Sequence, residues 1–157
     1  MMTPQQLMAL AVEKARAGVV AGQSPFGCAI AVGDEVLAVC HNTVVSTTDI
    51  TAHAEVNALR LACRQAGTIL LENCVVATTC EPCPMCMAAL HWARVREVFY
   101  GATIADTSAA GFNELTIAAA DVLTVGGSSV KLTSGILRDE CRTLFDEWLA
   151  QPDRVLY

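Results

Sequence analysis

Two short motifs, 30 residues apart, constrain the fold of this chain more than any other feature. His53 begins one segment with helical periodicity, and Cys83 and Cys86 begin another. Cysteines three positions apart at a helix start place both sulfurs on one face. There, the positive end of the helix favours the thiolate form that binds metal. We therefore expect a fold that brings the N-termini of two helices together around one metal ion.

The ligand set formed by His53, Cys83 and Cys86 predicts a zinc ion with one open coordination position. Three protein ligands are typical of catalytic zinc, whereas structural zinc is closed by four. Glu55 is not needed as a ligand, but beside a water whose pKa zinc lowers to about 7 it can carry protons. One alternative is a structural site with Cys80 as fourth ligand, which gives Glu55 no role. The other is Cys83 as a lone nucleophile, which leaves the paired cysteine unexplained.

Length and composition are those of one globular domain. The chain has 157 residues, of which 54% are hydrophobic and 17% charged, the usual size of a single domain. It has no run of 18 apolar residues and no pattern of a secretory signal, so neither a membrane partner nor secretion is expected. The eight cysteines then indicate metal binding in a reducing compartment, the cytoplasm. The high apolar content favours a further subunit.

The charge of the chain disfavours nucleic acid as a partner. The net charge is −6, and the ten Lys and Arg residues are scattered along the sequence. Binding to a phosphate backbone depends largely on clustered Lys and Arg.

Hydrophobic periodicity and turn residues predict alternating helices and strands. Thr3, Pro4 and Gln6 form a predicted helix start with a capping box. In chain order we expect a helix from residue 3 to about 18–22, strands over 26–32 and 36–41, a helix over 53–66, a strand over 74–79, a helix over 83–93, strands over 97–101 and 129–133, and a helix over 136–150. Residues 102–127 are interpreted as short helices and loops around the site. This order predicts an α/β/α sandwich of three layers.

The two motifs together resemble the signature of the zinc-dependent nucleobase and nucleoside deaminases. His53 and Glu55 match its first half, and the segment from Pro82 to Cys86 matches its second half. The chain is therefore similar to the cytidine deaminase-like superfamily over residues 1–157. The resemblance implies a single domain with a central five-stranded mixed sheet, one zinc ion per subunit and a small nucleobase as the substrate.

Within this superfamily, the segments 80–86 and 110–114 look most like those of bacterial guanine deaminases. The resemblance implies hydrolytic deamination of guanine to xanthine and ammonia, with Glu55 moving protons and Glu114 assisting at the amino group. Asn113 departs from that branch, which usually has Asp at this position. Taken alone, Glu114 is better explained as an exposed loop carboxylate.

The same resemblance makes Phe26, Asn42, Trp92 and Tyr157 candidate substrate-binding residues. Phe26 can pack on a flat ring and Asn42 offers a donor and an acceptor. Taken alone, these residues are equally explained as a core aromatic and a turn asparagine, and Trp92 as filling between helix and sheet. Guanine deaminases of this type end in Tyr on a segment that exchanges across a homodimer, so we expect Tyr157 to cover the partner's site. A frayed tail is the ordinary alternative.

Two other functions stay open at this point. One is deamination of another base or nucleoside, such as cytosine, guanosine or a tRNA adenosine, although the acidic charge weighs against tRNA. The other is a zinc-stabilised interaction module without turnover, in which Glu55 would have no catalytic role.

Overall fold

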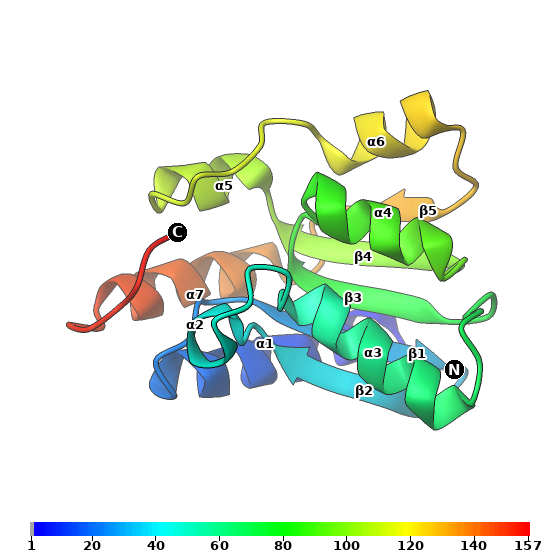
Figure 1. The fold of residues 1–157 in the computed structure, drawn as a ribbon, viewed down its shortest axis with the longest axis horizontal. Helices are drawn as coiled ribbons and strands as arrows, with labels where there is room; N and C mark the ends of the chain where they lie inside the picture. The colour runs from blue at the N-terminus through cyan, green and yellow to red at the C-terminus, as the bar shows by residue number, and fades with distance from the viewer. Residues whose placement is uncertain (1) are drawn as a thin grey trace.

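A mixed sheet with strand order β2-β1-β3-β4-β5 forms the middle layer of the protein (Figure 1). The computed structural model describes residues 2–157. The strands are β1 (Gly27–Val32), β2 (Glu35–His41), β3 (Val75–Cys80), β4 (Glu97–Ala102) and β5 (Lys131–Thr133). β1 runs antiparallel to both β2 and β3, whereas β3, β4 and β5 are parallel. The expected five-stranded mixed sheet is confirmed.

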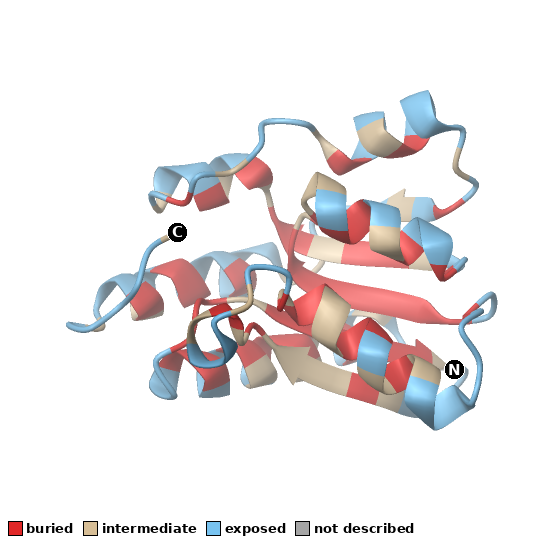
Figure 2. Cartoon of the chain, viewed as in Figure 1, coloured by how far each residue is buried: buried red, intermediate tan, exposed pale blue. Residues whose placement is uncertain are grey.

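Helices cover both faces of this sheet. They are α1 (Pro4–Val20), α2 (Val44–Thr47), α3 (Ala54–Ala66), α4 (Pro84–Trp92), α5 (Ile104–Ala109), α6 (Ala119–Gly126) and α7 (Arg138–Leu149). Alternate strand residues point to opposite faces. Ala77 therefore joins a core with α1 and α7, and Val76 joins a second core with α3, α4 and α6. Figure 2 shows the resulting buried centre of the sheet. The three-layer α/β/α sandwich is confirmed.

Local sequence determines where α1 begins. The hydroxyl of Thr3 accepts the Gln6 amide N–H at 3.2 Å, and the Gln6 side-chain oxygen accepts the Thr3 N–H at 2.9 Å. Pro4 occupies the first helical position, where its missing N–H is not needed. The predicted capping box is therefore present.

The start of two helices on one face of the sheet creates the site. His53 is the N-cap of α3 and Cys83 is the N-cap of α4. Both helices pack on the same core, on either side of β3 in Figure 1. β3 ends at Cys80, three residues before Cys83. The carboxyl end of β3 therefore lies next to the start of α4.

The structure differs from the sequence prediction mainly in short elements. α2 was not predicted, because four residues are too few to show a helical period. The segment 102–127 contains α5 and α6, which are joined by a loop over residues 110–118. No helix within residues 2–157 has the length and apolar character needed to cross a bilayer.

Candidate active site

His53, Cys83 and Cys86 form a three-ligand cluster at the start of α3 and α4. The Sγ atoms of Cys83 and Cys86 lie 3.7 and 3.4 Å from His53 Nδ1. The three ligand atoms are all within 4.8 Å of one another. In tetrahedral zinc, bonds of about 2.3 Å to sulfur and 2.0 Å to nitrogen place these atoms about 3.5 Å apart. The cluster therefore fits a zinc ion held through Nδ1 and two sulfurs.

One cysteine of the cluster favours its thiolate form, the form that binds a metal cation. The hydrogen bond from Cys86 lowers the pKa of the Cys83 thiol to about 4, and the same bond raises the pKa of Cys86. Burial disfavours the charged imidazolium of His53, but the bond to Cys83 and the charge of Glu55 outweigh it and raise its pKa. The low pKa of Cys83 therefore favours a thiolate in this pair of cysteines.

Cys80 does not extend this cluster to four ligands. Its Sγ lies 2.8 Å from the Thr107 hydroxyl and 3.6 Å from the carbonyl oxygen of Thr103. Burial raises the pKa of the Cys80 thiol well above its usual value. Within residues 2–157, the metal-ligand group consists of three residues, which does not support a closed structural zinc site.

Glu55 lies on the first turn of α3 and is buried. Its Oε1 accepts a 2.8 Å hydrogen bond from the hydroxyl of Thr78, a residue of β3. Burial raises the pKa of Glu55, although nearby His53 opposes the shift. A carboxylate of raised pKa, held beside a metal cluster, has the properties of a proton carrier.

A pocket of about 340 Å³ opens over the cluster, close to the lower limit of small-molecule sites. Phe26, Asn42, Glu55, Glu114 and Tyr157 all line it, although they are widely separated in sequence. The fold thus brings together all but one of the residues considered from the sequence for substrate binding and proton transfer.

Trp92 is the exception. It does not line the pocket, and its side chain is 79% exposed. The reason is its place at the end of α4, nine residues after Cys83, or roughly 13 Å along the helix axis. This position gives no support to Trp92 as a pocket wall or as filling between helix and sheet.

Glu114 belongs to the loop between α5 and α6 and is half-buried. Burial, followed by the negative charge of Cys83, raises the pKa of Glu114 to about 7. The preceding Asn113 has an exposed side chain, and its backbone N–H donates to the carbonyl oxygen of Tyr157 at 3.3 Å. The departure at Asn113 therefore leaves the Glu114 carboxyl group in the pocket.

Tyr157 lies over the pocket of its own chain. Its hydroxyl accepts a 2.6 Å hydrogen bond from Asn42 Nδ2, and its ring contacts Phe112 edge-on at 5.6 Å between centroids. Asn42 is fixed from the other side, because its Oδ1 accepts the Val44 amide N–H at 3.0 Å. Exchange of this tail between two chains stays a prediction.

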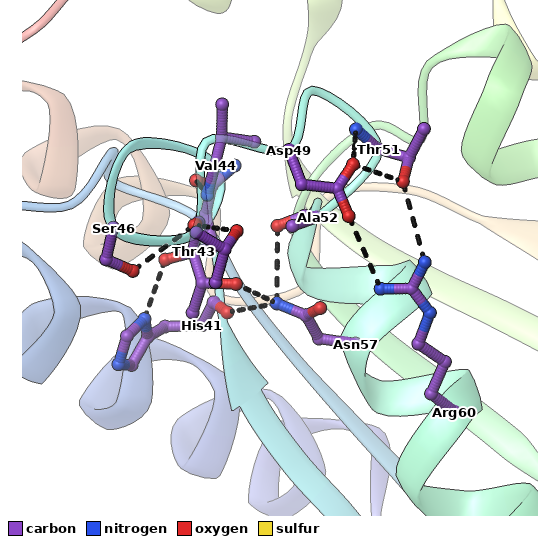
Figure 3. Close-up of polar contacts among 11 residues, drawn as sticks. His41, Thr43, Val44, Ser46, Asp49, Thr51, Ala52, Asn57 and Arg60 are labelled. Carbon is purple, nitrogen blue, oxygen red and sulfur yellow. Dashed lines mark hydrogen bonds and ion pairs between the residues drawn. The ribbon is translucent and has the colours of Figure 1, made fainter.

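Asn57, which the sequence analysis did not single out, supports two site residues at once. Its Nδ2 donates to the carbonyl oxygens of His41 at 3.1 Å and Ala52 at 3.2 Å (Figure 3). These carbonyls directly precede Asn42 and His53. The available signal was its position four residues after His53, on the same helix face.

The fold and the site together define a zinc-dependent aminohydrolase, and comparison with known proteins agrees. Residues 1–102 match the family model of the cytidine and deoxycytidylate deaminase zinc-binding region. The chain belongs to this family.

Three of the similar proteins belong to two groups of deaminases. Guanine deaminase from Bacillus subtilis is 43% identical over 70% of this chain and 69% of its own length. A tRNA-specific adenosine deaminase from Aquifex aeolicus is 36% identical over 64% of this chain and 67% of its own length. The solved guanine deaminase from Nitrosomonas europaea superposes with a TM-score of 0.87 at 30% identity, covering 96% of this chain and 87% of that one. The similar proteins therefore include deaminases of a free base and a deaminase of tRNA.

Proposed function

We propose that this protein deaminates guanine to xanthine and ammonia by hydrolysis. The observation that carries the proposal is that Glu55 and Glu114 share one pocket with the three-ligand cluster. Similarity to the guanine deaminases of Bacillus subtilis and Nitrosomonas europaea supports guanine as the base.

The two carboxyl groups divide the proton transfers. A bound zinc ion would supply a water molecule acidic enough to act as a nucleophile near neutral pH. Glu55, oriented by Thr78, takes a proton from that water and passes it to a ring nitrogen. Glu114, with a pKa of about 7, keeps a proton available for the departing amino group. One water is consumed, and one ammonia leaves for each xanthine formed.

Asn42, Phe26 and Tyr157 position the base in this proposal. The Asn42 amide nitrogen carries two N–H donors, of which one is donated to the Tyr157 hydroxyl and the other can be donated to a base. Phe26 is held edge-on by Phe112 at 5.2 Å and by Phe145 at 5.9 Å, so it can offer a fixed surface to a flat ring. The small volume favours a free base over a nucleoside.

The proposal also covers the oligomeric state of the protein, its metabolic role and its cell compartment. We infer a homodimer of one-domain subunits that exchange their C-terminal segments, acting in purine breakdown. The eight cysteines are all free, which fits the reducing cytoplasm.

An ammonia-release screen tests the substrate. The panel is guanine, cytosine, adenine, guanosine, cytidine and an amino-triazine, with zinc-loaded Glu55→Gln as the control for contaminating activity. Guanine should give the highest kcat/KM. Turnover of another compound with guanine inert would remove the substrate assignment but keep the deaminase family.

A further inference from the structure

Glu81 makes polar contacts that take no part in zinc binding or in the proposed proton transfers. It lies between the end of β3 and the ligand Cys83. Its Oε2 accepts the Ile104 amide N–H at 3.1 Å, and its Oε1 accepts the Ala119 amide N–H at 3.0 Å. Ile104 and Ala119 are the first residues of α5 and α6, so one carboxylate holds both ends of the segment between them.

That segment carries one side of the pocket. Its loop, residues 110–118, contains Phe112 and Glu114, and both line the pocket. The N-cap of α6 is Ala118, whose side chain cannot accept a hydrogen bond. Glu81 instead accepts the N–H of the first helical residue, one of the four N–H groups that a helix start leaves unpaired. Without Glu81, the start of α6 loses its side-chain acceptor.

Glu81 is also firmly joined to the metal cluster. Its own N–H donates to the carbonyl oxygen of Ala102 at 2.8 Å, which fixes its backbone against β4. Only Pro82 separates it from Cys83. The metal ligand and the loop that carries Glu114 are therefore located by the same residue.

We propose that Glu81 is a positioning residue that fixes Glu114 relative to the metal cluster. Its catalytic consequence rests on the proposed function, because Glu114 is the proton donor there. A displacement of about 1 Å at a reacting group can cost on the order of 100-fold in rate.

The first test is a double-mutant cycle in zinc-loaded protein. Glu81→Gln keeps the shape of the side chain but replaces one acceptor oxygen with a donor. It should lower kcat for guanine by about 10- to 100-fold, with zinc content and KM nearly unchanged. In a Glu114→Gln background, the same change should lower kcat by less than about threefold, because the positioned group is already lost. Equal losses in both backgrounds would overturn the proposal.

A second measurement does not depend on turnover. Amide hydrogen exchange of residues 110–118 should be faster in zinc-loaded Glu81→Gln than in wild type. Glu72→Gln is the matched control, since Glu72 makes only an exposed ion pair with Arg94 at 3.1 Å and should change kcat by less than about twofold. Unchanged loop exchange in Glu81→Gln would contradict the inference. Faster exchange in a protein that deaminates no guanine would instead reject the proposed function and keep the positioning role.

Ala119→Pro provides a variant that leaves Glu81 and the ligand motif intact. Proline removes the N–H that Glu81 accepts, at a first helical position where it is tolerated. The preceding Ala118 has φ −61° and ψ 141°, a conformation that proline permits in the residue before it. Ala119→Pro should accelerate loop exchange and lower kcat in the same direction as Glu81→Gln. Wild-type exchange and kcat in a folded, zinc-loaded Ala119→Pro protein would count against the proposal.

Discussion

The amide of Asn42 donates a 2.6 Å hydrogen bond to the hydroxyl of Tyr157, 115 residues later in the chain. This bond joins the residue that follows β2 to residue 157, and both residues line the pocket. Burial raises the pKa of Tyr157, against the hydrogen bond from Asn42, which lowers it. Because the amide nitrogen of Asn42 carries two N–H groups, it can donate to a base and to Tyr157 at once, which makes the tail part of substrate binding.

Removal of the tail should weaken guanine binding without unfolding the protein. Deletion of residues 155–157 should raise KM by about tenfold or more, because the pocket loses an aromatic cover. Tyr157→Phe keeps the ring and loses one hydrogen bond, so its effect on KM should stay within about 2- to 12-fold. Steady-state kinetics measure both values, and Val155→Ala at an exposed tail position is the control. Unchanged KM after deletion would show that the tail plays no part in binding.

Exchange of the tail between subunits can be tested with two impaired variants, assayed at a guanine concentration well below the raised KM. Glu55→Gln keeps its tail, whereas the deletion of residues 155–157 keeps Glu55. After the two are mixed and refolded, a hybrid with exchanged tails has one complete site, so guanine turnover should rise above that of either variant alone. If each tail covers its own chain, no hybrid site is complete. Absence of complementation in a confirmed hybrid dimer would therefore indicate tails that stay in place.

Short-range patterns made the metal site predictable from sequence. Cys83 and Cys86 are three residues apart at a helix start, and His53 occupies the same place in a second helix. The capping box at Thr3 was predictable for the same reason, because its partner Gln6 is three residues away.

Contacts between residues far apart in the sequence could not be predicted from such short-range patterns. The bond between Glu81 and Ala119 spans 38 residues and ends on a backbone N–H, which every residue except proline has. No side-chain identity therefore marks the partner. Trp92 was a candidate by resemblance alone, and the axis of α4 places it away from the metal cluster in this chain.

Glu55 should be the most sensitive residue for turnover. Glu55→Gln keeps the volume but cannot take a proton, so kcat should fall by about 10²- to 10⁴-fold. Thr78→Val removes only the hydrogen bond that orients Glu55, and should cost about 10- to 100-fold in kcat. Zinc content, measured by metal analysis, should stay at one per chain in both variants. A zinc-stabilised interaction module would instead show no deaminase activity that Glu55→Gln could reduce.

The raised pKa of Glu114 predicts a specific pH dependence of stability. Its folded pKa is about 7, above the usual value of 4.5, mainly because of burial. Between these two values the folded protein holds a proton that the unfolded chain has lost. The contribution of Glu114 to the free energy of unfolding is thus fully present below about pH 4.5 and falls as pH rises toward 7.

Glu114→Gln does not titrate, so relative to wild type it should be more stable at pH 8 than at pH 5. Chemical denaturation of both metal-free proteins at the two pH values measures this difference, because a bound zinc ion would itself lower the pKa of a nearby carboxyl group. A difference that is constant with pH, or larger at pH 5, would contradict the raised pKa of Glu114.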